Sequence, residues 1–371
     1  MIPIAEPKLF KLDKKILKES IDSNWISSQG PYISRFEEDF AKFQKSKFAI
    51  AVSNCTTALH LALLALKIKK GDEVICPALT FISPANMIHY TGAKLKLVDV
   101  SNYDLNLNAE ILEKYITKKT KAIIVVHQFG YPANMNEILR ISKKYKLKII
   151  EDNAESIGSK YHGKLTGSFG DIATYSFFGN KIITTGEGGM ITTNNKSLCK
   201  RIKILRDHGL TNKELYVHGF LGFNYRMTSL QAAIGIGQLS NLKKILVKKR
   251  EILETYKSKL SLIKNLKIFP LNENKNIKNV TWLITIKLNN FSKKKMNLLC
   301  KSMNKKGVNV RRMIQPVYKA KHFQRYFNKN DFPIAEKFSY SCLHLPSSLN
   351  LSKKEINLIC KLLSFEITKL S

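Results

Sequence analysis

The sequence predicts an α/β fold with a large domain, built on a seven-stranded and mostly parallel sheet, and a smaller C-terminal α/β domain. Two observations support this prediction. Short β-rich segments bounded by turn residues recur through the first half of the chain, and helix-like segments separate several of them. Such alternation is typical of a parallel sheet covered on both faces.

The expected strands of the large domain are short and rich in β-branched or aromatic residues. They lie at residues 48–52, 73–76, 95–98, 122–127, 147–151, 171–177 and 189–193. Helix-like segments at residues 57–67 and 135–145 lie between strands, whereas the last two strands resemble a hairpin. The sheet is therefore expected to be parallel except at this hairpin.

A long helical connection is expected over residues 224–260, followed by a small α/β cap. The expected elements of the cap are a strand at 281–288, a helix at 293–306, a strand at 308–313 and a closing helix at 353–367. We therefore predict a large domain over residues 1–244 and a small domain over residues 245–371.

The composition excludes several classes of protein. The 371 residues are 44% hydrophobic, with no long apolar run, and the first residues mix Lys with Pro and Glu, so no secretory signal sequence is expected. The six cysteines are scattered, without CxxC pairs or histidines at metal-ligand spacing. We expect a cytoplasmic protein with no membrane partner, no disulfide framework and no metal.

The net charge of +34 admits nucleic acid, an acidic surface or a polyanionic small substrate as partner. The lysines are spread along the whole chain, which favours solvated helix faces. A separate DNA-reading module has no residues left to form it, so no nucleic-acid partner is expected.

The first candidate binding site is the phosphate seat, residues 53–57, which follows an expected strand and opens an apolar helix. Free backbone N–H groups and the hydroxyls of Thr56 and Thr57 converge there at the positive end of the helix, which suits a phosphate. A plain helix cap by Ser53 or Thr56 is the alternative.

The second candidate is the pair Glu151 and Asp152 at the end of a buried strand. Carboxylates in such a place are costly unless a cation pairs with them, and a protonated pyridine nitrogen would be such a cation. A helix cap by one of these acids is the alternative.

The third candidate is Lys181, which follows the strand ending near Ser176 and precedes the glycine-rich residues 184–190. A desolvated lysine beside cationic groups becomes an amine nucleophile that can form a Schiff base. Taken alone, Lys181 could equally be one of the many surface lysines.

Together and in this order, these residues resemble the DegT-type (DnrJ/StrS-like) sugar nucleotide aminotransferases, a branch of the fold type I pyridoxal 5'-phosphate (PLP) enzymes. Further matches lie at residues 25–30, 71–77, 125–127, 206–209 and 222–228. The resemblance implies a PLP-dependent transaminase. Lys181 would form the Schiff base and move a proton between cofactor and substrate, Asp152 would pair with the pyridine nitrogen, and Phe81 would stack on the ring.

The resemblance also implies how the cofactor phosphate is held. Thr56, Thr57 and Ser176 would bind it, and Asn224 would reach it from the neighbouring subunit, so that a homodimer shares its active sites. Cys55 stands where the family usually has glycine. If that position needed a positive φ, the strain would cost on the order of 1 kcal/mol and loosen PLP, whereas a helix-cap conformation would remove the objection.

The substrate is predicted from one more feature of the resemblance. Glu155 stands near the cofactor's ring oxygen, where Gln is usual but Glu is common in a branch that acts on GDP-linked 4-keto-6-deoxy sugars. This predicts conversion of GDP-4-keto-6-deoxymannose to GDP-perosamine, with glutamate as donor and 2-oxoglutarate as product; a dTDP- or UDP-linked 4-keto sugar is the alternative. The expected substrate contacts are His127, Arg226, Arg311 and Tyr318.

Three other functions fit parts of this pattern. One is a degenerate binding protein, which would arise if Cys55 abolished cofactor binding. The intact Asp152, Ser176 and Lys181 argue against it. A PLP-dependent sugar dehydratase shares this fold but carries histidine in place of the lysine, so Lys181 argues against it. A non-catalytic sensor of PLP or of a sugar nucleotide is the alternative from another class.

Overall fold

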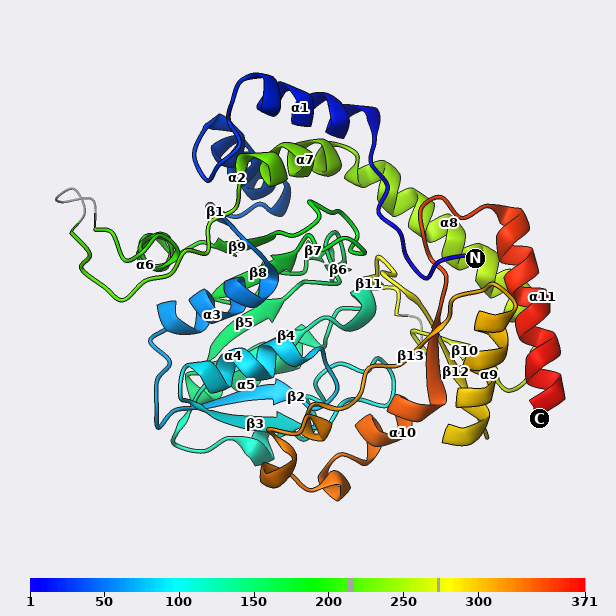
Figure 1. Cartoon of the computed structure of the whole chain (residues 1–371). Helices are drawn as coiled ribbons and strands as arrows, with labels where there is room; N and C mark the ends of the chain where they lie inside the picture. Colours follow the sequence, from blue (N-terminus) through cyan, green and yellow to red (C-terminus); the bar gives the residue numbers. More distant parts are fainter. Residues whose placement is uncertain (212–216, 272–273, 371) are drawn as a thin grey trace.

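A seven-stranded sheet forms the centre of the large domain (Figure 1), in a computed structural model that describes residues 1–211, 217–271 and 274–370. Across the sheet the strands follow the order β1-β9-β8-β5-β4-β2-β3. They span β1 Phe48–Val52, β2 Glu73–Pro77, β3 Lys94–Val98, β4 Thr120–Val126, β5 Lys148–Asp152, β8 Ile172–Ser176 and β9 Gly189–Thr193. All seven predicted strands are confirmed, with ends that differ by only a residue or two.

The sheet is parallel except for one strand. β9 pairs antiparallel with β8 on one side and with β1 on the other, while every other pairing in the sheet is parallel. The predicted hairpin and the predicted mostly parallel sheet are therefore both confirmed.

Helices cover both faces of this sheet, because its strands carry apolar side chains on both sides. Ile149 of β5 belongs to the same apolar cluster as Ile138 and Ile141, whereas Ile150 belongs to a different cluster, which includes Ala58. The helices of the large domain are α1 Lys11–Asp22, α2 Pro31–Gln44, α3 Cys55–Ala65, α4 Ile82–Tyr90, α5 Met135–Tyr145, α6 Lys196–Arg206 and α7 Ser229–Ser240. Successive residues of β5 thus face different helices, which matters for the two acids at its end.

A second, antiparallel sheet of four strands lies in the C-terminal part, in the order β10-β12-β14-β13. The helices α8, α9 and α11 pack with it around one apolar cluster, and α8 runs from the end of α7 to the side of α11 (Figure 1). These elements span α8 Leu242–Leu260, β10 Leu266–Ile268, β12 Ile284–Leu288, α9 Lys293–Lys305, β13 Arg311–Arg312, α10 Pro333–Ser341, β14 Cys342–Leu345 and α11 Lys353–Leu370. A small sheet joins β11 Ile277–Lys278 to β6 Lys160–Tyr161 and β7 Lys164–Leu165.

Two predicted strands of the C-terminal part are longer than the observed ones. The strand predicted at 281–288 begins only at Ile284, because Thr281 has a φ of 51°, which extended backbone does not adopt. The strand predicted at 308–313 is reduced to Arg311–Arg312, since Val308 bridges to Ile2 instead.

The two parts of the chain are joined at several points. α8 continues without a break through residue 244, and Ile2 exchanges backbone hydrogen bonds with Gly307 and Asn309 of the C-terminal part. The division into domains at residue 244 stays a prediction.

The cysteines and the helices of the described residues bear on the sequence-based expectations. All six cysteines are buried and free. In the described ranges, none of the helices has the length and apolar character needed to cross a bilayer, and no three His, Cys, Asp or Glu side chains are grouped as metal ligands.

A buried acid fastens the first turn of α10 to the large sheet. Asp99, directly after β3, accepts the backbone N–H groups of Ile334 and Ala335, each at 2.9 Å. Burial raises the pKa of Asp99, although these hydrogen bonds oppose the shift. The carboxylate thus satisfies helix donors that no residue of α10 reaches.

We predict that Asp99→Ala lowers the free energy of unfolding by roughly 1–2 kcal/mol, the usual cost of losing a helix cap. Urea unfolding of the full-length protein measures it. Asp22→Ala is the control, because Asp22 makes an exposed pair with Lys18 and should change stability by less than about 1 kcal/mol. Equal effects of the two substitutions would contradict the assignment.

Candidate active site

The three polar strand ends predicted from the sequence lie on one side of the large sheet. β1, β5 and β8 run in the same direction, so they end at the same edge. Cys55 Sγ, just beyond β1, lies 3.9 Å from Asp152 Oδ1 at the end of β5, and Lys181 acts electrostatically on the same carboxylate. The structure therefore brings the predicted elements of the site together.

The phosphate seat is the first turn of α3. Asn54 caps this helix, since its Oδ1 accepts the Thr57 N–H at 2.9 Å, so the alternative of a cap by Ser53 or Thr56 is wrong. The Thr57 hydroxyl is used within the turn, where it donates to the Asn54 carbonyl at 2.8 Å. The N–H groups of Cys55 and Thr56 have no acceptor among the described residues and are free to bind an anion.

Cys55 has an ordinary helical backbone, so the strain considered for this position does not arise. Its thiol is buried against Asp152, and burial raises its pKa well above the usual value. The close approach in this region is made by Gly189 of β9, where a Cβ would lie 2.6 Å from the carbonyl carbon of Asn54. Cys55 can thus donate its backbone N–H to a phosphate, without a contribution from its side chain.

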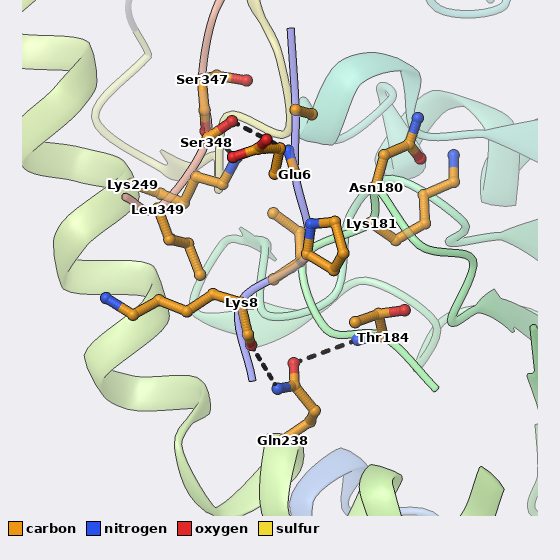
Figure 2. Close-up of a pocket in the computed structure, with 13 residues that line it drawn as sticks. Glu6, Lys8, Asn180, Lys181, Thr184, Gln238, Lys249, Ser347, Ser348 and Leu349 are labelled. Atoms are coloured by element: carbon orange, nitrogen blue, oxygen red, sulfur yellow. Dashed lines mark hydrogen bonds between the residues drawn. The ribbon is translucent and has the colours of Figure 1, made fainter. Parts of the chain in front are cut away.

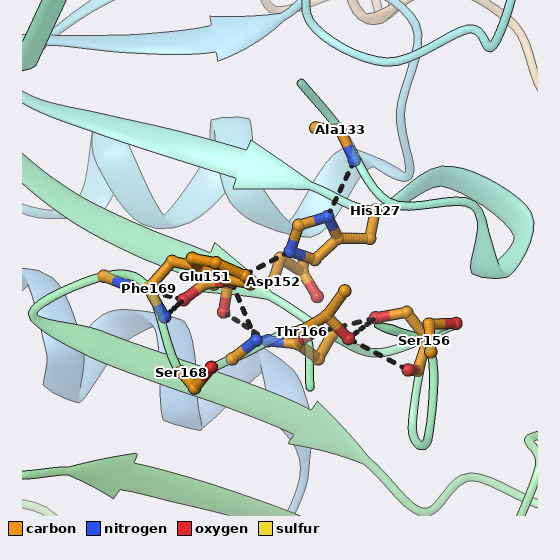
Figure 3. A network of polar contacts seen from close by, with 12 residues as sticks. His127, Ala133, Glu151, Asp152, Ser156, Thr166, Ser168 and Phe169 are labelled. Atoms are coloured by element: carbon orange, nitrogen blue, oxygen red, sulfur yellow. Dashed lines mark hydrogen bonds and ion pairs between the residues drawn. The ribbon is translucent and has the colours of Figure 1, made fainter. Parts of the chain in front are cut away.

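Glu151 is saturated with hydrogen bonds (Figure 3). Its Oε1 accepts the N–H groups of Phe169 and Gly170 at 2.7 and 2.6 Å, and its Oε2 accepts Gly167 N–H at 2.7 Å. The His127 ring also contacts Oε2, at 3.1 Å. This carboxylate holds residues 167–170 against β5 and has no capacity left for a ligand.

His127 was predicted to contact substrate, and its geometry argues against that role. The ring is fully buried, Nδ1 accepts the Ala133 N–H at 3.1 Å, and Nε2 faces Glu151. With both nitrogens used inside the protein, His127 is a structural residue in this arrangement.

Asp152, on the opposite face of β5, is satisfied far less well. Its Oδ1 accepts the Ala154 N–H at 3.0 Å, and Oδ2 accepts no hydrogen bond from the described residues. Burial raises its pKa, against the effects of that hydrogen bond and of the Lys181 charge. A buried carboxylate in this state is stabilised by a cationic donor, so its surroundings fit the pyridinium nitrogen of PLP.

Lys181 contacts an acid and an indole ring. Its Nζ lies 3.6 Å from Glu155 Oε1 and 3.7 Å from the centre of the Trp282 ring. Cationic neighbours are expected from the sequence, whereas the contacts found are an acidic side chain and the face of an aromatic ring. Figure 2 shows Lys181 beside Asn180, on a loop that faces the N-terminal segment.

Glu155 connects Lys181 to the backbone. Its Oε2 accepts the Phe129 N–H at 2.7 Å, and burial raises its pKa while Lys181 opposes that shift. Phe129 stacks on Trp282, with ring centres 6.4 Å apart. Sequence reasoning missed Trp282, for which the only signal is that the chain has just two tryptophans.

The remaining predicted cofactor residues line the same edge. Ser176 is buried at the end of β8, and its Oγ accepts the Phe178 N–H at 3.3 Å. Phe81 precedes α4 and is 62% exposed, so a face of its ring is available for stacking. The hydroxyl of Thr56 lies 2.9 Å from that of Ser83, a residue the sequence argument did not single out.

Asn224 and Arg226 lie together outside this cluster. Asn224 Oδ1 accepts from Arg226 Nε at 3.0 Å, and Arg226 pairs with Asp207 at 3.0 Å. His208 also contacts this guanidinium, at 3.2 Å. No contact joins this group to Lys181 in the described part of the chain.

The other two predicted substrate residues also lie apart. Tyr318 is buried, stacks on Phe332 and donates its hydroxyl to Glu336, and burial raises its pKa. Arg311 is exposed on β13, the edge strand of the four-stranded antiparallel sheet. No contact among the described residues joins either one to Lys181.

An under-satisfied buried acid, a lysine and an open helix end are what a PLP enzyme needs for the pyridine nitrogen, the aldehyde and the phosphate. The fold and this site define a PLP-dependent aminotransferase. The chain belongs to the DegT/DnrJ/EryC1/StrS aminotransferase family, whose model matches residues 8–364. The predicted family, enzyme class and cofactor are confirmed.

Several known proteins are similar along almost their whole length. The chain is 41% identical to GDP-perosamine synthase of Escherichia coli O157:H7, over 97% of both chains, and 40% identical to that of Caulobacter vibrioides, over 96% and 95%. Among solved structures, the Helicobacter pylori aminotransferase PseC of pseudoaminic acid biosynthesis is 28% identical, with a TM-score of 0.94 and 99% of each chain covered. Spr1654 of Streptococcus pneumoniae in a PLP form, at 24% identity, covers 100% of this chain and 99% of its own with a TM-score of 0.94, which shows the fold.

We predict that Glu151→Gln destabilises the protein by about 3 kcal/mol, because one acceptor oxygen is replaced by an amide that faces buried donors. Urea unfolding measures the change. The matched control is Glu110→Gln at an exposed position, which should have almost no effect. Unchanged stability of Glu151→Gln would show that the carboxylate does not hold residues 167–170.

Proposed function

We propose that this protein transfers the amino group of glutamate to the C4 ketone of a GDP-linked 4-keto-6-deoxy sugar, so that GDP-perosamine and 2-oxoglutarate are formed. The observation that supports the sugar most is the near full-length similarity to GDP-perosamine synthases from three bacteria. The geometry around Lys181 and Asp152 supports the amino transfer.

Bound PLP would supply an electron-withdrawing ring, through which the amino group of glutamate passes to the sugar. In this proposal Lys181 would hold the cofactor through its aldehyde carbon. The released amine of Lys181 would then move a proton between the cofactor and the reacting carbon of the amino donor or of the sugar. Asp152 keeps the pyridine nitrogen protonated, because its buried carboxylate has no other cation in hydrogen-bonding contact. The N–H groups of Cys55 and Thr56, with nearby hydroxyls, hold the phosphate.

Glu155 has a role of its own in this proposal. It is 3.6 Å from the Lys181 amine and is buried with it. A carboxylate at this distance holds the released lysine in place, within reach of the carbon to which the proton returns. Glutamine would position the amine without this charge.

We predict that the protein loaded with PLP loses its visible absorbance band when glutamate is added, and regains it with GDP-4-keto-6-deoxymannose. Lys181→Ala should lower the rate of amino transfer by at least about 1,000-fold, because both halves of the reaction use this amine. Absorbance and chromatography of the sugar nucleotides measure these steps. Lys164→Ala, an exposed lysine, is the control.

The same experiment with dTDP- and UDP-linked 4-keto sugars tests the nucleotide. Faster turnover of either one than of the GDP sugar would contradict the proposed substrate. A protein that cannot take up PLP, or whose band glutamate leaves unchanged, would contradict amino transfer itself.

We also propose a homodimer in which Asn224 of each subunit reaches the cofactor phosphate of the other. Residues 217–223, which precede Asn224, extend from the body of the molecule beside α6 (Figure 1). They expose large apolar side chains, with Leu221 89% and Phe220 49% exposed. A partner subunit would cover them.

We predict that Lys181→Ala and Asn224→Ala proteins, each nearly inactive alone, recover about one quarter of wild-type activity when mixed and allowed to exchange subunits. Half of the dimers are then hybrids, and each hybrid has one intact site. Light scattering establishes the dimer. No recovery in mixtures that demonstrably contain hybrids would contradict a shared site.

A further inference from the structure

Lys249 is a buried cation that the proposed function does not use. It belongs to α8 and is 5% exposed, and its Nζ donates to the carbonyls of Trp282 and Ser347, at 3.0 and 2.8 Å. It has no ion pair with any described residue, and burial lowers its pKa to about 7. Burying a lysine without an ion pair costs free energy, so the two carbonyl groups that it contacts indicate a specific role.

The backbone carbonyl that Lys249 holds belongs to the residue that covers Lys181. The Trp282 ring lies 3.7 Å from Lys181 Nζ, and its Nε1 donates to the Asn180 carbonyl at 2.7 Å. Trp282 lies outside the regular strand, since β12 begins at Ile284 after the positive φ of Thr281. The sheet ladder does not fix this carbonyl, whereas the Lys249 ammonium donates a hydrogen bond to it.

Ser347 completes the same contact. Its Oγ donates to the Trp282 carbonyl at 3.3 Å, while its own carbonyl accepts from Lys249. One ammonium therefore joins α8, the segment before β12 and the segment after β14. The charged residues that share the pocket around it are Glu6 and Lys8 of the N-terminal segment and Lys181 on its loop (Figure 2).

We propose that Lys249 is a positioning residue for the active site: by holding the Trp282 carbonyl, it fixes the indole ring against the Lys181 amine. This inference rests on the proposed role of Lys181 in amino transfer. Loss of the charged hydrogen bond lets the indole move, and Lys181 then loses one of the two groups that orient it.

The chain offers a direct spectroscopic test, because Trp25 and Trp282 are its only tryptophans. In a full-length Trp25→Phe background, with and without PLP, the fluorescence and acrylamide quenching of Trp282 are measured from pH 6 to pH 9. We expect a change with a midpoint near pH 7, where Lys249 loses its proton. Lys249→Met should remove this transition and raise the quenching constant about twofold, since it removes the donor.

Lys249→Arg is the conservative variant and keeps the test decisive if Lys249→Met fails to fold. Arginine keeps its charge and its donors, so low quenching should persist to pH 9 without a transition near pH 7. A transition that remains near pH 7 in Lys249→Arg, or unchanged quenching in a folded Lys249→Met, would overturn the proposal.

The pH dependence of stability gives a second readout. The folded protein holds Lys249 with a pKa of about 7, against 10.5 for an ordinary lysine. Between these values the unfolded chain binds the extra proton, so the free energy of unfolding should rise from pH 7 to pH 10 relative to that of Lys249→Met. A difference that is flat or falls with pH would contradict a buried Lys249.

Kinetics separates this proposal from the proposed function. Lys249→Met should lower kcat about tenfold with little change in KM for the sugar nucleotide, because Lys249 acts through Lys181. The fluorescence and stability results need no substrate. If they agree while no sugar is aminated, the proposed function fails and the positioning of Trp282 stands.

Discussion

The site depends on how the structure accommodates two acids at the end of one buried strand. Glu151 and Asp152 are neighbours in β5 and therefore point to opposite faces of the sheet. Glu151 receives three backbone N–H groups and a histidine nitrogen, while Asp152 receives a single backbone N–H. Glu151 therefore stabilises the fold, whereas Asp152 remains available to bind a cation.

The C-terminal part of the chain contributes the side chain that covers the Lys181 amine. Lys181 lies on a loop of the large sheet, but its amine is covered by Trp282, which precedes β12. The N-terminal segment pairs with the C-terminal part at Ile2, and α8 runs from the end of α7 to the side of α11. The arrangement of the site is therefore coupled to the packing of the two parts.

Much of the fold could be predicted, because strands buried on both faces leave a strong local pattern. Patterns of this kind do not show where a strand begins, as beyond Thr281, whose positive φ excludes extended backbone at that residue. Lys181 and Asp152 were identified from their positions after strands together with the family resemblance. Trp282 and Lys249 could not be, since their contacts join segments far apart in sequence. The position of His127 at a strand end fits a substrate contact and a structural role equally, and only its buried contacts favour the structural role.

The central claim is that Lys181, among the many lysines of this chain, holds the cofactor. The most direct test is to reduce the PLP-loaded protein with borohydride, digest it, and locate the modified lysine by mass spectrometry. The account predicts one modified peptide, containing Lys181. Modification of Lys249 or of surface lysines, with Lys181 unmodified, would contradict it.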